Sequence, residues 1–337
     1  MCPIAVGPPV EVTAEVIARE AMPTGHHAEA PAAPAPVRLV APALGIDQPT
    51  GPSPTTGWAD PRPGRHPLLE HAVGEVIERT PLPVDLGVVV TITSAVPPGA
   101  SLGTSASVVV AVLAALDALC GAAPTPTDPS AVDPATRRST RDRAAADLAM
   151  RAHRVETVRA GRQAGVQDQW IAALGGAVRL DVGPYPEGRW RRLALTDATV
   201  AALDERLVTV VVGRHDSSAV HEEVIQAITS CGGVDQDRAR AALRRLAALA
   251  QEAAAALEAG DLEAWAAALV ESTATQARLH PALVGPDHAR AIAVAADQGA
   301  TGWKVNGAGG AGGSLTVLAA DRPGAADDLA AALSSTS

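Results

Sequence analysis

Aromatic side chains are nearly absent from this chain of 337 residues, which contains no phenylalanine and a single tyrosine. Proteins bind single-stranded nucleic acids largely by stacking bases on aromatic rings, so the composition argues against that class of ligand. The net charge of −10, with no local run of basic residues, argues equally against nucleic-acid and anionic-membrane surfaces. We therefore expect a small-molecule partner, with no nucleic acid and no membrane.

Cysteines are few, and their spacing fits no metal site or CxxC motif: the chain has only Cys2, Cys120 and Cys231. Such isolated thiols are typical of a reducing compartment. Long apolar runs are also missing, because no stretch of about 18 apolar residues occurs and no basic segment precedes an apolar one at the N-terminus. These absences predict a cytoplasmic protein.

Apolar residues nevertheless make up 47% of the chain, enough for a large core built from Ala, Val and Leu. Alternation over 9–17 predicts a strand with Val10, Val12, Ala14 and Val16 pointing inward. Long loops are expected at 22–37, 47–67 and 121–139. Further strands are expected at 37–44, 85–94, 175–182 and 206–213, and helices at 68–80, 106–119, 141–160, 221–229, 236–260 and 261–280. Without strict βαβ alternation, this order indicates an α+β fold.

The stretch PPGASLGTSASVVVAV at 97–112 places glycines and hydroxyl residues directly before an apolar helix. Gly99 and Gly103 allow the backbone to approach a ligand closely, and the helix that follows offers unpaired N–H groups and a positive dipole end to an anion. The Walker pattern GxxxxGK[ST] is absent. By itself the stretch is equally consistent with a hydroxyl-rich N-cap on a buried helix.

A second glycine cluster, KVNGAGGAGGSLTVL at 304–318, follows Lys304, the only lysine in the chain. Gly307, Gly309 and Gly312 satisfy the dinucleotide pattern GxGxxG, which would suggest an oxidoreductase. The residues after the glycines favour a strand, whereas a dinucleotide site needs a helix there. The cluster is therefore expected to join two strands.

The segment GVQDQW at 165–170 places Asp168 between two amides. A carboxylate in such a loop can act as a general base, although a single aspartate is more often a turn former. Glu156, upstream in an expected helix, could bind magnesium beside a hydroxyl such as that of Ser105.

Taken together, these motifs resemble those of the GHMP kinases. PPGASLGTSAS is similar to the second motif of the family, PxxxGLGSSAA, and KVNGAGGAGG to the third, KxxGAGxGG. GVQDQW with AALGG resembles the GxQDQYAAAFGG block of a sugar-kinase branch that includes kinases of heptose 7-phosphate and fucose. HRVE at 153–156 and RHDSSAVHEEV at 214–224 also resemble that branch.

The resemblance implies ATP and Mg²⁺ as cofactors and Asp168 as the catalytic base. It implies that Ser105 and Glu156 hold the metal. The residues implied to bind the nucleotide are Pro97, Pro98, Gly99, Ala100, Ser101, Leu102, Gly103, Thr104, Ser105, Ala106, Ser107, Lys304, Gly307, Gly309 and Gly310. The implied partner is a sugar or sugar phosphate, and a homodimer is left open.

The fold implied by the resemblance has two lobes, with the boundary in 182–206. Residues 1–190 would form an α+β lobe that resembles a ribosomal protein and contains a left-handed βαβ unit. Residues 191–337 would form a ferredoxin-like lobe.

The start of the chain departs from the family pattern. GHMP sugar kinases open with a motif resembling RISFAGGGTD, which supplies a basic residue, whereas 1–9 contains no Arg or Lys. Either the start of the sequence has been assigned downstream of this motif, or the chain is a diverged member.

The expected reaction is phosphoryl transfer from ATP to a sugar hydroxyl. A nucleotide-binding homologue without activity and a kinase of a non-sugar alcohol such as homoserine or mevalonate are the alternatives.

Overall fold

The computed structural model describes residues 10–18, 37–52, 57–58, 66–83, 85–97, 99–121, 134–213, 217–230 and 234–335. The chain divides into two compact units. The N-unit holds the described residues of Val6–Val96 and Ser105–Leu174. The C-unit holds those of Gly175–Ser337 together with the inserted loop Pro97–Thr104. The expected boundary between residues 190 and 191 stays a prediction.

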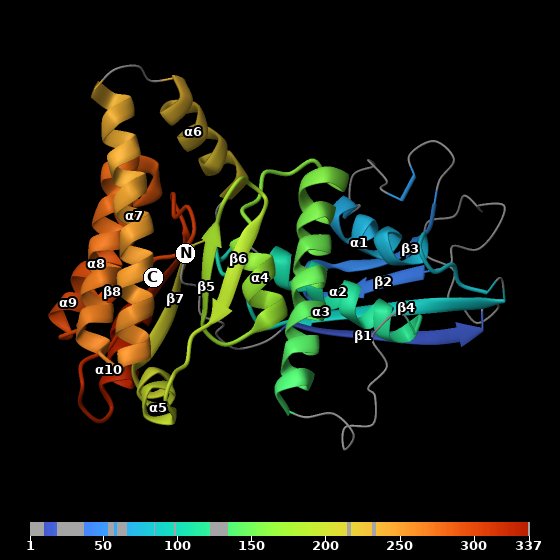
Figure 1. Cartoon of the computed structure of the whole chain (residues 1–337), viewed down its shortest axis with the longest axis horizontal. Helices are drawn as coiled ribbons and strands as arrows, with labels where there is room; N and C mark the ends of the chain where they lie inside the picture. The colour runs from blue at the N-terminus through green and yellow to red at the C-terminus, as the bar shows by residue number, and fades with distance from the viewer. Residues whose placement is uncertain are drawn as a thin grey trace. The chain divides into compact units, whose positions relative to one another are not determined.

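The N-unit is built on a four-stranded sheet in the order β1-β4-β2-β3, formed by β1 (Val10–Ala18), β4 (Leu86–Ser94), β2 (Val37–Ala41) and β3 (Ile46–Thr50). β4 pairs antiparallel with β1 and parallel with β2, and β2 pairs antiparallel with β3 (Figure 1). A short 3₁₀ turn, Pro42–Leu44, joins β2 to β3. Because β2 and β4 are parallel, the chain between them must cross over, and it does so through β3 and helix α1 (Pro67–Ile77).

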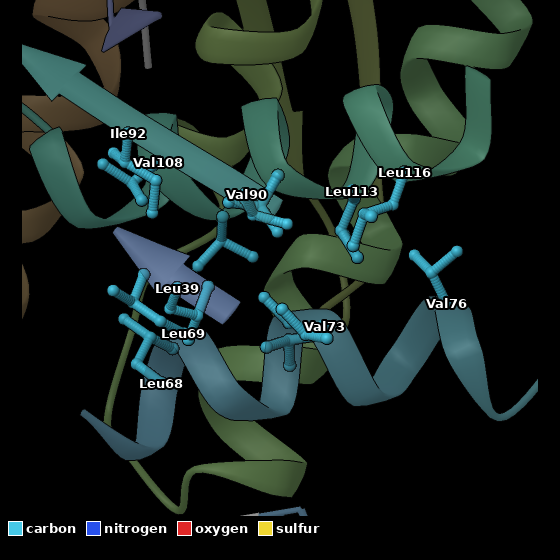
Figure 2. Close-up of a cluster of buried hydrophobic side chains, with 14 of the residues drawn as sticks. Leu39, Leu68, Leu69, Val73, Val76, Val90, Ile92, Val108, Leu113 and Leu116 are labelled. Carbon is cyan, nitrogen blue, oxygen red and sulfur yellow. The ribbon is translucent and has the colours of Figure 1, made fainter. Parts of the chain in front are cut away.

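The core of the N-unit lies between the sheet and two helices, α1 and α2 (Thr104–Leu119). Figure 2 shows Val73 and Leu69 of α1 pointing towards Leu39 of β2 and Val90 of β4, with Leu113 of α2 beside them. α2 is apolar around most of its circumference, which explains why it is buried.

The second half of the N-unit consists of α3 (Pro134–Arg154), a π-helical turn (Val155–Arg159) and α4 (Gln167–Leu174). A π turn inserts one extra residue into a helix, and such turns occur frequently at functional sites. Here the turn contains Glu156, which is buried.

The C-unit contains a three-stranded antiparallel sheet in the order β7-β9-β8, formed by β7 (Leu207–Gly213), β9 (Gly313–Leu318) and β8 (Gly302–Val305). A separate hairpin pairs β5 (Val178–Val182) with β6 (Gly188–Arg192). The helices of the unit are α5 (Asp197–Arg206), α6 (Ser217–Ser230), α7 (Val234–Ala259), α8 (Leu262–Leu279), α9 (Pro286–Asp297) and α10 (Ala325–Ser334), with a 3₁₀ turn at Pro281–Leu283 (Figure 1).

The two faces of the C-unit sheet contact different helices, since successive strand residues point to opposite sides. Trp303 and Val305 of β8 join a cluster with α9 and α10. Gly302 and Lys304 face α8 instead: a Cβ at Gly302 would lie 2.7 Å from the Cα of Ala266, and Lys304 contacts the side chain of Gln276. The strand pattern thus directs the only lysine towards α8.

The expected α+β class and most expected elements are confirmed, but the loop expected at 47–67 is wrong at its start. Ile46–Thr50 forms the edge strand β3, in which Pro49 is tolerated. The buried polar residue Gln48 satisfies its amide by donating to Glu70 of α1, at 3.0 Å. Trp58 is also buried, packed on Gly74.

Two further expectations need correction. Val16 is 46% exposed rather than inward, because β1 lies at the edge of the sheet and the half-buried position shifts to Ile17. Residues 134–139 of the loop expected at 121–139 are helical, since α3 begins at Pro134 and proline is favoured in the first turn of a helix, whereas 122–133 lie outside the described residues.

Glu75 of α1 ties that helix to α3 and the π turn. Its buried carboxylate lies 2.9 Å from Nε of Arg159 and within 4 Å of guanidinium nitrogens of Arg79, Arg151 and Arg154. Removing one partner of a buried ion pair leaves the other charge uncompensated. We expect Glu75→Gln to lower the free energy of unfolding by roughly 2–3 kcal/mol, measured by urea denaturation.

The control is Glu78→Gln, which removes a single ion pair to Arg159 from a carboxylate that is 46% exposed. That change should cost less than about 1 kcal/mol. Equal effects of the two substitutions would contradict the role of Glu75.

Candidate active site

The loop before α2 has the backbone geometry that its glycines suggested. Gly99 and Gly103 have φ of 79° and 67°, and Ser101 has φ of 55°. Ser101 is the one non-glycine residue with positive φ in the described part of the chain. Residues other than glycine rarely adopt this backbone conformation, and those that do cluster at functional sites. The loop delivers the chain into α2, whose first residue is Thr104.

The second glycine cluster packs against this loop inside the C-unit. A Cβ at Gly307 would lie 3.4 Å from the Cβ of Ser101, so the two segments touch. Gly309 has φ of 55° and lies so close to the chain that a Cβ would be 2.1 Å from the carbonyl oxygen of Leu283. The structure therefore brings together two motifs that are about 200 residues apart in the sequence.

The glycine cluster joins β8 to β9, as the sequence predicted. No helix follows it, and residues from Gly313 onwards pair with β7 and β8. The dinucleotide interpretation of Gly307, Gly309 and Gly312 thus lacks the helix N-terminus that it requires.

Lys304 approaches the cluster from β8 with only neutral acceptors. Its Nζ donates to Oε1 of Gln276 at 2.6 Å and to the carbonyl oxygen of Val305. In the described ranges no carboxylate pairs with it. Because burial disfavours the charged form, the pKa of Lys304 falls to about 7.

In the N-unit, three side chains from separate elements meet at Glu156. Its Oε1 accepts a hydrogen bond from Oγ of Ser105 at 2.8 Å, and its Oε2 accepts one from Nε2 of Gln169. Ser105 lies in the first turn of α2, Glu156 in the π turn and Gln169 in α4. Both donors are neutral groups, so neither of them carries a positive charge to the carboxylate.

Asp168 lies beside this group in the first turn of α4, not in the tight loop expected from the sequence. Burial raises its pKa to about 6, with the charge of Glu156 adding to the effect and a hydrogen bond from Gln167 opposing it. A carboxylate with a pKa near 6 is a better proton acceptor than an ordinary one, yet it is still ionised at neutral pH. Asp168 therefore has the chemical character that a general base requires.

The residues expected to hold a metal fit magnesium. Oγ of Ser105 and a carboxylate oxygen of Glu156 are the hard oxygen donors that this ion takes, and it completes its shell with waters and phosphates. Within the ranges that the structure describes, no group of three or more His, Cys, Asp and Glu side chains gathers in a form that could hold a metal.

The other expected nucleotide-binding residues follow the course of the loop and the start of α2. Ala100 and Ala106 are buried, and Leu102 and Ser107 are half-buried. Pro97 opens the loop, whereas Pro98 lies outside the described residues. Gly310 has φ of 81°, and its carbonyl oxygen packs on Gly285.

Two glutamines in these groups were missed by sequence reasoning. Gln169 is 1% exposed and Gln276 is 9% exposed, and both hydrogen-bond to a charged side chain. The pattern QDQ did contain Gln169, but only as a neighbour of the aspartate. Nothing in the sequence around Gln276 connects it to Lys304.

Comparison with known proteins finds a similarity to one family model over part of the chain. Residues 68–176 match the model of the GHMP kinases N terminal domain. This segment is therefore similar in sequence to the GHMP kinase N-terminal domain. It contains α1 from Leu68 onwards, the loop 97–103, Ser105, Glu156 and Asp168. The GHMP kinases are phosphotransferases that act on alcohol groups. No curated protein matches the sequence.

Solved structures of GHMP kinases share the fold over nearly the whole chain. Mevalonate kinase of Leishmania major, solved with R-mevalonate, has 17% identity and a TM-score of 0.65, covering 97% of this chain and 82% of its own. D-glycero-D-manno-heptose 1-phosphate kinase of Bacteroides thetaiotaomicron has 17% identity and a TM-score of 0.62, covering 96% and 80%. Phosphomevalonate kinase of Streptococcus pneumoniae, solved with phosphomevalonate and AMPPNP, has 14% identity and a TM-score of 0.61, covering 96% and 86%.

These likenesses confirm the GHMP kinase fold expected from the two glycine motifs, and they leave the substrate open. No helix in the described residues has both the length and the apolar character needed to cross a bilayer.

Proposed function

We propose that this protein transfers the γ-phosphoryl group of ATP to a hydroxyl group of a sugar or sugar phosphate. The observation that carries the proposal is the group around Glu156, in which a buried carboxylate, a serine hydroxyl and a carboxylate of raised pKa meet in the N-unit. Phosphoryl transfer requires little covalent chemistry from a protein. It depends on positioning and on neutralising charge, for which these groups are suited.

Asp168 accepts the proton of the attacking hydroxyl in this proposal. The hydroxyl oxygen forms a bond to the γ-phosphorus, the bond from that phosphorus to the bridging oxygen breaks, and ADP leaves. Ser105 and Glu156 would hold Mg²⁺, which when bound offsets the negative charge of the phosphates. The first turn of α2, which contains Ser105, would receive phosphate groups through backbone N–H groups.

The sugar-kinase branch is favoured by GVQDQW followed by AALGG at 165–176 and by RHDSSAVHEEV at 214–224. A heptose phosphate or a related sugar is therefore the proposed acceptor. The solved neighbours include a heptose 1-phosphate kinase and mevalonate kinases at similar TM-scores, so mevalonate belongs in any screen. A cytoplasmic location and a homodimer stay predictions.

A screen of acceptors tests the proposal. ADP release is measured with ATP and Mg²⁺ against heptose phosphates, fucose, galactose, homoserine and mevalonate, with binding of AMPPNP measured in parallel. We expect release with one sugar. Release with mevalonate or homoserine alone would correct the substrate class, and AMPPNP binding without any release would indicate a homologue that binds nucleotide without catalysis.

A further inference from the structure

Gln276 of α8 bridges the only lysine and the glycine cluster. Its Oε1 accepts from Nζ of Lys304 at 2.6 Å, and its Nε2 donates to the carbonyl oxygen of Gly307 at 3.1 Å. The side chain is buried, at 9% exposure. An amide can accept from a cation and donate to a carbonyl at the same time, and a glutamate or leucine of similar size cannot do both.

Among the residues that the structure describes, the surroundings of Lys304 provide no counter-charge. On α8, Glu271 is paired with Arg245 at 2.5 Å, Arg278 donates to Thr275 at 2.6 Å, and Glu263 lies in the first turn at the opposite end of the helix. The other strand packed on β8 is β9, whose sequence GSLTVL has no charged residue. In the described part of the chain, a protonated Lys304 is therefore compensated by dipoles alone, and burial lowers its pKa to about 7. An incoming anion would supply the missing negative charge.

Gly307, the residue that Gln276 contacts through its Nε2, lies against the loop that precedes α2. Gly307, whose carbonyl accepts from Gln276, packs against Ser101 of that loop, as described above. A second contact fixes the same strand, since Oγ1 of Thr273 donates to the carbonyl oxygen of Trp303 at 3.3 Å and accepts from the backbone N of Val305 at 3.2 Å. One face of α8 thus holds both β8 and the start of the glycine cluster.

We propose that Gln276 is a positioning residue, which fixes the ammonium group of Lys304 and the backbone of Gly307 so that the C-unit receives phosphate groups of a nucleotide. The inference rests on the proposed function for the identity of the anion. It extends that function by assigning a role to a side chain on a helix that carries none of the sequence motifs.

The first test observes Lys304 directly. Because the chain has a single lysine, protein labelled with ¹³C at the lysine Cε gives one signal, whose titration reports the pKa of this group. Gln276→Leu removes the acceptor and should lower that pKa, whereas Gln276→Glu places a carboxylate beside Nζ and should raise it by at least about one unit. The control Gln251→Leu, at an exposed position of α7, should leave it unchanged. A pKa of Lys304 that is the same in wild type and in both Gln276 variants would overturn the proposal.

The second test measures binding of Mg²⁺–AMPPNP by calorimetry. Gln276→Leu loses the hydrogen bonds to Lys304 and to Gly307. Its affinity for Mg²⁺–AMPPNP should therefore be roughly 10-fold or more weaker than that of wild type, since a hydrogen bond to a charged group contributes about 1.5–3 kcal/mol. In steady-state kinetics, Gln276→Leu should have a higher KM for ATP than wild type, with kcat at saturation within about threefold of the wild-type value. Thermal unfolding of the variant identifies any loss of fold. If wild type binds and Gln276→Leu binds equally well, this inference is wrong. If wild type does not bind Mg²⁺–AMPPNP, the proposed function fails as well. Failure of the inference alone and failure of the proposed function therefore give different results.

Discussion

Asp168→Asn should lower kcat by roughly 10²- to 10⁴-fold, the range that positioned general bases contribute, and should leave the affinity for AMPPNP nearly unchanged. Asparagine has the shape of aspartate but cannot accept a proton at neutral pH. The loss should therefore appear in turnover and not in nucleotide binding. Steady-state ADP release at saturating ATP and acceptor, with calorimetry on the same preparations, measures both quantities.

The raised pKa of Asp168 makes a second expectation possible from the same residue. Since the base must be ionised, wild-type kcat should fall as the pH drops below about 6, the pKa of Asp168. A raised pKa also means that the native state binds a proton more tightly than the unfolded chain between about pH 4 and pH 6, so the ionised carboxylate costs stability above pH 6. Asp168→Asn removes that cost and should unfold at a temperature no lower than wild type at pH 7.5.

The control for Asp168 is Asp181→Asn, since Asp181 is 55% exposed on β5 and pairs only with Arg179 in the described part of the chain. Its turnover should match wild type. An Asp168→Asn protein that is folded and fully active would remove Asp168 from the mechanism.

Glu156→Gln should lower kcat about 100-fold or more at ordinary Mg²⁺ concentrations. The substitution keeps the shape of the side chain and removes its charge, so an ion held by this oxygen and by Ser105 loses its anionic ligand. Charge stabilisation by a metal amounts to several kcal/mol, and about 1.4 kcal/mol corresponds to a factor of ten. Activity measured against Mg²⁺ concentration should show a raised requirement for the ion.

The pH profile gives a readout of Glu156→Gln that does not depend on the metal. The charge of Glu156 raises the pKa of Asp168, so its removal should move the acid limb of the profile below pH 6. The exposed residue Glu263 of α8 provides the matched control, Glu263→Gln, which should change neither property. An unchanged Mg²⁺ requirement together with an unchanged acid limb would contradict the role of Glu156.

Regular elements with strong periodicity were predictable from the sequence, and those that depend on tertiary contacts were not. α1 and β4 follow from their apolar spacing, because burial of one face sets the pattern. β3 could not be found in this way, since its buried residues include Gln48 and Thr50 and it contains a proline. Gln48 is buried because its partner Glu70 comes from elsewhere in the fold.

The residues of the candidate site that lie in sequence motifs were predictable, and the others were not. Ser105, Glu156 and Asp168 were expected, and the structure groups them in the N-unit. The π turn that presents Glu156 and the amides of Gln169 and Gln276 have no signal in a single sequence, because they depend on hydrogen bonds between distant helices and strands. Packing, rather than residue type, selects these positions.

Phosphorus NMR of a reaction mixture tests the central claim most directly. With ATP, Mg²⁺ and the acceptor found in the screen, we predict that wild type forms ADP and one new phosphomonoester signal in equal amounts, and that Asp168→Asn forms neither on the same timescale. ADP formed together with free phosphate alone, or equal product from both proteins, would contradict the assignment of this chain as a kinase that uses Asp168 as its base.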